Sequence, residues 1–407
     1  MKTRPEEKRS SPSRRRFLRQ SAAGALGLSA LSKAGGAMAQ TLSPDTIPAQ
    51  TGVPSGIVRL NFNENPAGPS PKALEAIRSH LHEMNLYGIN TTALLMKLNQ
   101  MAGIDFSDLD LSRRSDLNEM WRKNRVFLSD GSGNLLRAAA FTLLRQGGEV
   151  VEAEPAYGDV SEHADFMDSE LGINVKTVRV PLTRDMRHDL DGMRSAVHSR
   201  TRLVVVTNPN NPTGTIVTPA SLERFILSIP EEVVVLVDEA YVEYVQAPGF
   251  RSMAHLAISR PNVLVTRTFS KVYGLPGLRM GYALGMPDTF KHFWMHTSFP
   301  SPIAIHAAGA AVDDAPHVAN SKQTTWRGRD FLYSRLDEMG LTYVQTESNF
   351  LIVDVGDSDR ITRELARSGV FVRNAERLWK LNGHIRVSVG TDSDNDAFVN
   401  ALRRIIT

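Results

Sequence analysis

Lys271 is the residue of this chain that is best suited to covalent chemistry. It follows the apolar run Asn262–Thr266, which has the character of a buried strand. Ligand sites in open α/β sheets form at the carboxyl ends of the strands, and a lysine amine can form a Schiff base with an aldehyde cofactor. Taken alone, Lys271 could equally be an ordinary solvated lysine after a strand.

The residues on both sides of Lys271 suit a phosphate group. Thr268 and Ser270 lie just before the lysine, and Arg279 follows it by eight residues, after a turn that contains glycine. Hydroxyl groups donate hydrogen bonds to phosphate oxygens, and arginine can bind them in bidentate fashion. We therefore expect the phosphate of an aldehyde cofactor to bind here.

Polar residues also follow three other predicted strands. Gly131, Ser132 and Gly133 open a predicted helix, whose unpaired N–H groups and positive dipole end favour an anion. The carboxyl ends of parallel strands meet at one edge of a sheet, so these groups should form one site with Lys271. The strands predicted at 126–128, 202–207 and 233–237 lead into the turns 130–134, 208–214 and 238–241.

The order of the predicted elements indicates an α/β fold. Apolar strands alternate with helices up to residue 284, which implies a mostly parallel sheet covered by helices on both faces. Strands at 348–354 and 384–389, with helices near 359–368 and 394–405, indicate a second lobe. We predict an N-terminal arm and part of a small domain over 40–80, a large domain over 81–300 and a small C-terminal domain over 301–407.

The N-terminal 39 residues are similar to a twin-arginine export signal. Ser13–Arg19 contains the arginines, a weakly apolar Ser21–Ala37 follows, and small residues permit cleavage between Ala39 and Gln40. This predicts export to the periplasm as a folded protein. A basic disordered tail is the alternative, whereas glycines and Lys33 interrupt the apolar run and disfavour a stable membrane anchor.

Charge and residue usage exclude several other classes. The formal charge is +3, but residues 1–39 hold nine basic and two acidic residues, so the remainder carries about −4. The basic leader is therefore no argument for nucleic-acid binding. The chain has no cysteine and cannot form a disulfide, and its eleven histidines show no metal-ligand spacing, so we expect no metal site.

Four motifs occur in the order and rough spacing of the class I/II aminotransferases, which are fold-type I pyridoxal-phosphate enzymes. The chain resembles this family from about residue 55 to residue 405, and it is most similar to the histidinol-phosphate aminotransferase branch at 60–66, 208–214, 237–241, 369–373 and 385–391. The four motifs are Asn211–Gly214, Asp238–Tyr241, Ser270–Lys271 with Arg279, and Arg386.

The resemblance implies a fold, a cofactor and partners. The fold would have a large domain with a mostly parallel seven-stranded sheet between helices and a smaller α+β domain. The cofactor would be pyridoxal 5′-phosphate, and the substrates would be an amino donor and a 2-oxo acid. The family forms homodimers with shared active sites, so a homodimer is implied as well.

The resemblance also implies roles for single residues. Lys271 would form the internal aldimine and then move a proton between the substrate Cα and the cofactor C4′, which requires a depressed pKa. Asp238 would hold the pyridine nitrogen protonated, and Arg386 would bind the substrate carboxylate. The other implied contacts are Gly131, Ser132, Gly133, Thr268, Ser270 and Arg279 at the phosphate, Asn211 and Tyr241 at the 3′ oxygen, Tyr157 on the ring face, Tyr87 at the neighbouring subunit's phosphate, and Arg373 and Asn63 at the substrate.

The resemblance leaves the reaction and the donor open. Decarboxylases and oxidases use related scaffolds, and a non-catalytic cofactor-binding protein is a further alternative. Gly133–Asn134 stand where the branch usually has acidic residues, and Gly88 follows Tyr87 where it usually has proline. These two positions differ from the branch. An export signal is also unexpected on a chain similar to cytoplasmic biosynthetic enzymes, so the identity of the donor stays open.

Overall fold

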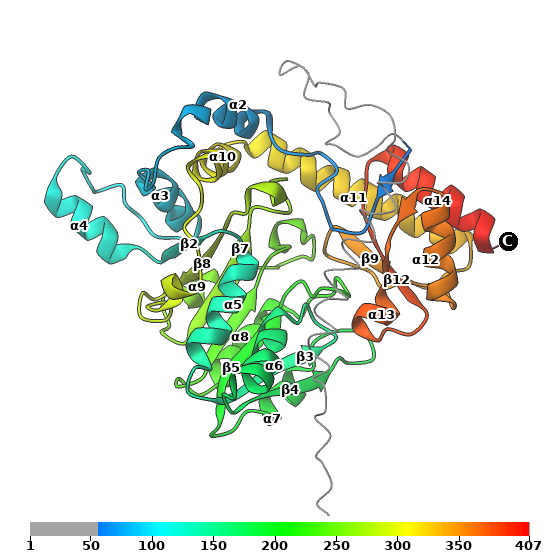
Figure 1. Ribbon diagram of the computed structural model, residues 1–407, viewed down its shortest axis with the longest axis horizontal. Coiled ribbons are helices and arrows are strands. Elements are labelled where there is room, and N and C mark those ends of the chain that lie inside the picture. Colours follow the sequence, from blue (N-terminus) through cyan, green and yellow to red (C-terminus); the bar gives the residue numbers. More distant parts are fainter. Residues whose placement is uncertain (1–55, 407) are drawn as a thin grey trace, which may run out of the picture. The chain divides into compact units, whose positions relative to one another are not determined.

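A seven-stranded sheet lies at the centre of the computed structural model, which describes residues 56–406 (Figure 1). Strand β8 runs antiparallel to both of its neighbours, β2 and β7, and the other neighbouring pairs are parallel. The mostly parallel sheet predicted from the sequence is therefore confirmed. The strand order is β2 (Val126–Ser129), β8 (Gly281–Gly285), β7 (Val263–Thr268), β6 (Val234–Asp238), β5 (Thr201–Thr207), β3 (Gly148–Glu154) and β4 (Val175–Pro181).

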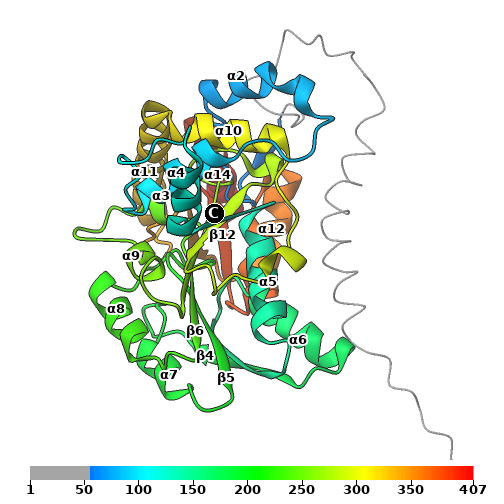
Figure 2. The same ribbon diagram turned by 90° about the vertical axis from the view of Figure 1, so that its left-hand side faces the viewer.

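Helices cover both faces of this sheet, which explains why its strands are apolar at successive positions. Leu203 and Leu236 pack with one set of helices, whereas Val204 and Val235 pack with the other. The first set is α5 (Ser132–Leu143), α6 (Asp159–Leu171) and the short 3₁₀ helix η4 (Phe293–Met295). The second is α2 (Pro71–Ser79), α3 (Thr92–Met101), α7 (Leu190–Ser195), α8 (Pro219–Ser228), α9 (Ala254–Ala257) and α10 (Pro302–Val312) (Figure 2).

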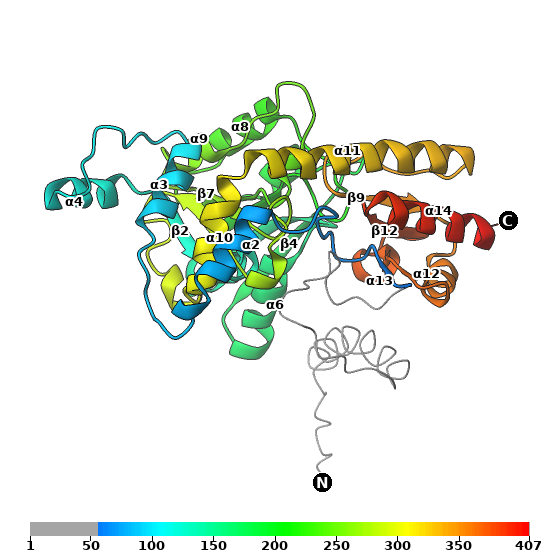
Figure 3. The same cartoon turned by 90° about the horizontal axis from the view of Figure 1, so that it is seen from above.

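A separate core surrounds a three-stranded antiparallel sheet, as the sequence predicts for a second lobe. Its strands lie in the order β11 (Arg373–Asn374), β12 (His384–Ser388) and β9 (Phe350–Asp354). Helices α12 (Ser358–Arg367) and α14 (Asp392–Ile406) pack on it together with α11 (Ala315–Glu338), which runs on from α10 to this sheet (Figure 3). The domain boundaries at 80 and 300 stay predictions, and the structure adds that α2 and α10 share the core of the large sheet.

Two elements differ from the sequence predictions. Pro71 is a favourable first helical residue, and the sequence predicts a helix from there to about Met84, but α2 ends at Ser79, because His80 leaves the helical conformation, and η1 (Leu81–Glu83) follows it. The sequence also indicates one strand-like segment at 370–373, whereas the structure divides it between β10 (Val370–Phe371), which pairs with β1 (Val58–Arg59), and β11 in the three-stranded sheet. The remaining elements are α4 (Arg114–Lys123) in the predicted surface insertion, α13 (Ala375–Trp379), η2 (Val242–Tyr244) and η3 (Pro276–Leu278).

The predicted export signal lies outside the described residues. Within residues 56–406, no helix combines the length and the apolar character that crossing a bilayer requires.

Candidate active site

The N-terminus of α5 and Arg279 form an anion-binding corner at the end of β7. A Cβ atom on Gly131, which precedes α5 with φ 113°, would lie 2.7 Å from a terminal guanidinium nitrogen of Arg279. This backbone conformation favours glycine, and a side chain here would also displace the guanidinium group. Gly281 pairs with Thr268, and a Cβ on Gly281 would lie 2.5 Å from the backbone nitrogen of Ser132.

The predicted phosphate donors thus meet from three chain segments. The Thr268 hydroxyl donates to the Ser270 hydroxyl at 3.0 Å and accepts from the Ser270 N–H at 3.1 Å. Together with the N–H groups that open α5 and with Arg279, these donors can hold a phosphate dianion.

Lys271 lies beside this corner, and its side-chain amine is held by the N-terminal arm. The Nζ atom donates to the backbone carbonyls of Phe62 and Asn63, each at 3.2 Å, and it lies 5.5 Å from the centre of the Tyr241 ring. Burial of the amine, with a smaller contribution from the Arg386 guanidinium, lowers the pKa of Lys271 to about 7. A large fraction of the amine is therefore neutral and nucleophilic at neutral pH.

Asp238 ends β6 inside the site and is buried. The Thr266 hydroxyl on β7 donates to its Oδ1 atom at 2.8 Å. Burial nevertheless raises the pKa of Asp238 to about 7, and the nearby Asp159 and Glu239 raise it further than the Lys271 charge lowers it. The carboxylate thus lacks a strong counter-charge, which a protonated ring nitrogen would supply.

Asn63 joins the N-terminal arm to the end of β6 and to β12. Its Nδ2 atom donates to the Tyr241 hydroxyl at 2.9 Å, and its backbone N–H donates to the Ser388 hydroxyl at 2.9 Å. Asn63 adopts a left-handed conformation, with φ 55°, that asparagine tolerates better than most residues. The N-terminal arm is therefore held against Tyr241, which the family resemblance places at the cofactor's 3′ oxygen.

Arg386 on β12 is buried between two aromatic rings. Its guanidinium carbon lies 5.1 Å from the Phe350 ring centre and 4.8 Å from the Trp379 ring centre. One terminal nitrogen donates to Asn211 Oδ1 at 2.7 Å and the other to the Asn61 carbonyl at 3.1 Å. Burial lowers the pKa of Arg386 to about 10, and its Nε donor is buried without a partner. An incoming carboxylate would satisfy both the charge and the free donor.

Arg373 lies directly beside Arg386. The two residues are partners in the pairing of β11 with β12, and Arg373 Nε donates at 2.9 Å to the same Asn61 carbonyl. The Arg373 guanidinium also stacks 4.5 Å from the centre of the Phe62 ring. Two arginine side chains therefore converge on one backbone carbonyl of the arm.

The two remaining predicted residues differ in their positions. Tyr157 interacts electrostatically with Asp159, Asp238 and Arg279, so it belongs to the same cluster, and 45% of its surface is exposed. Tyr87 is fully exposed, and its predicted contact, which involves a neighbouring subunit, stays a prediction.

Sequence reasoning missed four contributors to the site. Thr266 is hidden inside an apolar strand, and Asn61 acts through its carbonyl, which no side-chain pattern reveals. In the sequence, Phe350 and Trp379 look like ordinary core residues. Only the fold shows that they are the neighbours of Arg386.

These residues fit pyridoxal phosphate. The glycine-lined corner with its hydroxyl groups and Arg279 suits the phosphate, and the neutral amine of Lys271 suits the aldehyde. Asp238 is a buried carboxylate that a protonated ring nitrogen would suit, and the amide of Asn211 and the hydroxyl of Tyr241 can hydrogen-bond an oxygen substituent of the ring.

Comparisons with known proteins agree with this geometry. The chain is 36% identical to histidinol-phosphate aminotransferase from Moorella thermoacetica over 358 residues, which cover 86% of each protein. It is 35% identical to histidinol-phosphate aminotransferase 2 from Pseudomonas aeruginosa over 380 residues, which cover 90% of this chain and 96% of the relative. Both relatives therefore span nearly the same length as the described chain.

A solved structure and a family profile complete the comparison. The structure of histidinol-phosphate aminotransferase from Sinorhizobium meliloti in complex with pyridoxal-5′-phosphate matches with a TM-score of 0.71 and 25% identity, covering 90% of this chain and 98% of the other. The profile described as aminotransferase class I and II matches residues 55–402. The chain therefore belongs to the class I and II aminotransferase family and is a pyridoxal-phosphate-dependent aminotransferase.

Proposed function

We propose that Lys271, Asp238 and Tyr241 carry out the transamination. Bound pyridoxal phosphate supplies an electron-withdrawing ring that stabilises negative charge at the substrate Cα. Lys271 holds the cofactor in the resting enzyme and, once released, takes the Cα proton and delivers it to C4′. The lowered pKa of Lys271 supports this role, because a base that works at neutral pH needs a pKa near 7.

The other residues orient the reacting groups. Asp238 keeps the ring nitrogen protonated, and Asn211 and Tyr241 fix the 3′ oxygen. Arg386 binds the α-carboxylate of an amino acid, or the corresponding polar end of a donor without a carboxylate, through its unpartnered Nε and a terminal nitrogen. Tyr157 packs on the ring face, while Gly131, Ser132, Gly133, Thr268, Ser270 and Arg279 hold the phosphate.

We propose further that the preferred donor brings a phosphate group to the paired side chains of Arg373 and Arg386, as histidinol phosphate does. The single observation that carries this proposal is the pairing of Arg373 with Arg386 on adjacent strands. Both guanidinium groups are anchored on the Asn61 carbonyl, so each retains N–H donors for an anion. Relatives named histidinol-phosphate aminotransferase support the same donor class.

A donor panel tests the proposal. Histidinol phosphate, aspartate, phenylalanine and histidinol are each supplied with 2-oxoglutarate, and glutamate formation is measured with and without oxygen. We expect the highest kcat/KM for histidinol phosphate and no oxygen requirement. A preference for histidinol over histidinol phosphate would contradict phosphate binding by the arginine pair, and release of carbon dioxide or oxygen consumption in place of glutamate would favour a decarboxylase or an oxidase.

The enzyme is also proposed to be a homodimer. Large apolar side chains are exposed in two segments that adjoin α10, one around η1 and one around η4. In a dimer, Tyr87 would reach the cofactor phosphate of the other subunit. The exposed side chains are Leu81, Met84, Leu86 and Tyr87 in the first segment and Trp294, Met295 and Phe299 in the second.

Light scattering on a sizing column tests the dimer. Met84→Glu should give monomers, because a charge cannot be buried without a partner. Met101→Glu is the matched control, since Met101 is an exposed methionine outside both segments. A Met84→Glu protein that remains dimeric would contradict this interface.

Export through the twin-arginine route is proposed from the leader. Replacing Arg14 and Arg15 by lysine should leave active enzyme in the cytoplasm, whereas the unchanged leader should direct the cleaved protein, beginning near Gln40, to the periplasm. Fractionation followed by an activity assay distinguishes the two, and periplasmic activity of the lysine variant would argue against this route.

A further inference from the structure

A second cluster of ligand-type side chains lies apart from the cofactor site, where η1 packs against α10. His80, Glu83 and His306 each offer one ligand atom, and these atoms all lie within 4.8 Å of one another. Within residues 56–406, this is the only group of three or more His, Cys, Asp or Glu side chains with that geometry. None of the three belongs to the residues that surround Lys271.

His306 already contacts both of the other side chains in the cluster. His306 Nε2 lies 2.8 Å from Glu83 Oε2, and the His80 and His306 rings stack with their centres 3.6 Å apart at an angle of 19°. The side chains of Glu83 and His306 are 20% and 27% exposed. In the single chain these two side chains are therefore partly shielded and partly open to solvent.

His80 is held in the tautomer that a metal ligand needs. Its Nδ1 atom lies 2.8 Å from the carbonyl oxygen of Ala76. A carbonyl can only accept a hydrogen bond, so Nδ1 carries the proton and the lone pair is on Nε2. A histidine that binds a metal through one nitrogen commonly donates the other N–H to a backbone carbonyl in this way.

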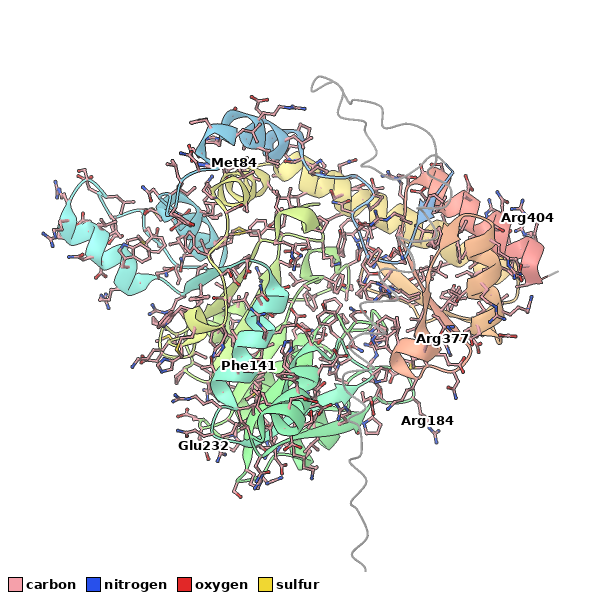
Figure 4. The ribbon with its side chains drawn as sticks, in the orientation of Figure 1. Met84, Phe141, Arg184, Glu232, Arg377 and Arg404 are labelled. Carbon is pink, nitrogen blue, oxygen red and sulfur yellow. The ribbon has the colours of Figure 1, made fainter. Side chains whose placement is uncertain are left out.

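The elements that carry the cluster are fixed independently of it. Helices α2 and α10 share the core of the large sheet through Ala73, Ala304 and Ala307. His80 ends α2, and its backbone N–H donates to the Ile77 carbonyl. The labelled side chain of Met84, which follows η1, lies near α10 in Figure 4. The ligands thus project from two packed elements rather than from a free loop.

We propose that His80, Glu83 and His306 bind a divalent transition-metal ion of the zinc class, which ties η1 to α10. Imidazole ligands favour zinc and its neighbours over magnesium or calcium. Zinc binds nitrogen and oxygen at about 2.0–2.2 Å, which puts tetrahedral ligand atoms about 3.3 Å apart. The ligand atoms lie within 4.8 Å of one another, so the side chains need to close by at most about 1.5 Å to reach that spacing. Water, or the neighbouring His82, completes the four ligands.

This site differs from the expectation of no metal site, because histidine spacing along the chain is uninformative here. Glu83 and His306 are 223 residues apart. Only the packing of α2 and η1 on α10 brings the ligands together.

Calorimetry with zinc chloride tests the proposal on untagged holoenzyme that has been treated with a chelator and desalted. We expect one zinc ion per chain. His80→Gln, Glu83→Gln and His306→Gln should each weaken binding by at least about tenfold, since each removes one of three protein ligands. Magnesium chloride should give no binding.

His198→Gln is the matched control. His198 Nε2 lies 2.8 Å from Glu149 Oε2, the same separation as in the His306–Glu83 pair, but that pair does not form a three-ligand group. This variant should bind zinc as the unchanged enzyme does. Equal binding by all four variants, or no binding by the unchanged enzyme, would overturn the proposal.

A further measurement needs no variant. In crystals soaked in zinc, anomalous scattering at the zinc edge should give a peak between His80, Glu83 and His306. A peak elsewhere, or none, would overturn the site even if a variant failed to fold.

Discussion

Asn211 at the end of β5 and Arg386 on β12 are joined by a hydrogen bond of 2.7 Å between Asn211 Oδ1 and a terminal nitrogen of the arginine. This bond links the large sheet to the three-stranded sheet. Because the amide oxygen accepts from Arg386, the Nδ2 group of Asn211 remains available as a donor to the cofactor's 3′ oxygen. Asn211, which is expected at the cofactor, and Arg386, which is expected at the substrate carboxylate, therefore hold each other in position.

Asp238→Asn should leave the cofactor bound and slow transamination strongly. An amide cannot hold the ring nitrogen protonated, and removing one partner of a buried charge pair costs about 3–5 kcal/mol. Since about 1.4 kcal/mol corresponds to a factor of ten, we expect the rate to fall by about two to four powers of ten. Single-turnover absorbance measurements with a donor test this. A variant that binds the cofactor and reacts within tenfold of the unchanged enzyme would contradict the role of Asp238.

Cofactor addition to the apoenzyme should follow the protonation of Lys271. Only the neutral amine attacks the aldehyde, so the rate should rise with pH through about 7 and level off above it, whereas an unperturbed lysine would titrate near about 10.4. Burial is the main cause of the low pKa; the cations Arg386 and Arg279 lower it further, and the anions Glu64 and Asp238 oppose them.

Arg386→Gln should shift this profile to higher pH, because removing a nearby cation favours the protonated amine. Arg373→Gln is the matched control, since Arg373 is not among the largest influences on the pKa of Lys271. Stopped-flow reconstitution at a series of pH values gives both profiles, and identical profiles would contradict the electrostatic coupling.

Arg373→Gln should also separate donors by charge. We expect KM for a donor with a distal phosphate or carboxylate to rise by about one to two powers of ten, consistent with the loss of a charge-assisted hydrogen bond of about 1.5–3 kcal/mol. Neutral donors should change little. Arg59→Gln is the control, because Arg59 also stacks on Phe62, at 5.5 Å, but pairs with Glu64. Equal effects of Arg373→Gln on both donor classes would remove its role in specificity.

The large sheet and the residues at its strand ends could be predicted because each signal is local. Strands buried on both faces are apolar at successive positions, as in Val233–Val237, and the polar residue that ends each run marks the carboxyl edge. Lys271, Asp238 and Asn211 were found in this way, and the structure brings them to one site.

The arm and the second lobe were harder to predict because their geometry depends on distant contacts. Asn61 contacts Arg386, and Asn63 contacts Tyr241, only because the N-terminal arm crosses to β12. No hydrophobic periodicity in the sequence indicates that path. The segment 370–373 is too short and apolar to reveal that it serves two sheets. His80 ends α2 although the apolar pattern continues past it, so the predicted helix ran too far.

Reductive labelling determines whether this aminotransferase holds its cofactor on Lys271. The purified holoenzyme is treated with borohydride and digested, and the pyridoxyl-modified peptide is identified by mass spectrometry. The account predicts one label per chain, on Lys271. Lys322, which lies 5.2 Å from the Trp326 ring centre on α11, should carry none. A label on another lysine, or an enzyme that transaminates with no reducible lysine linkage, would contradict the account.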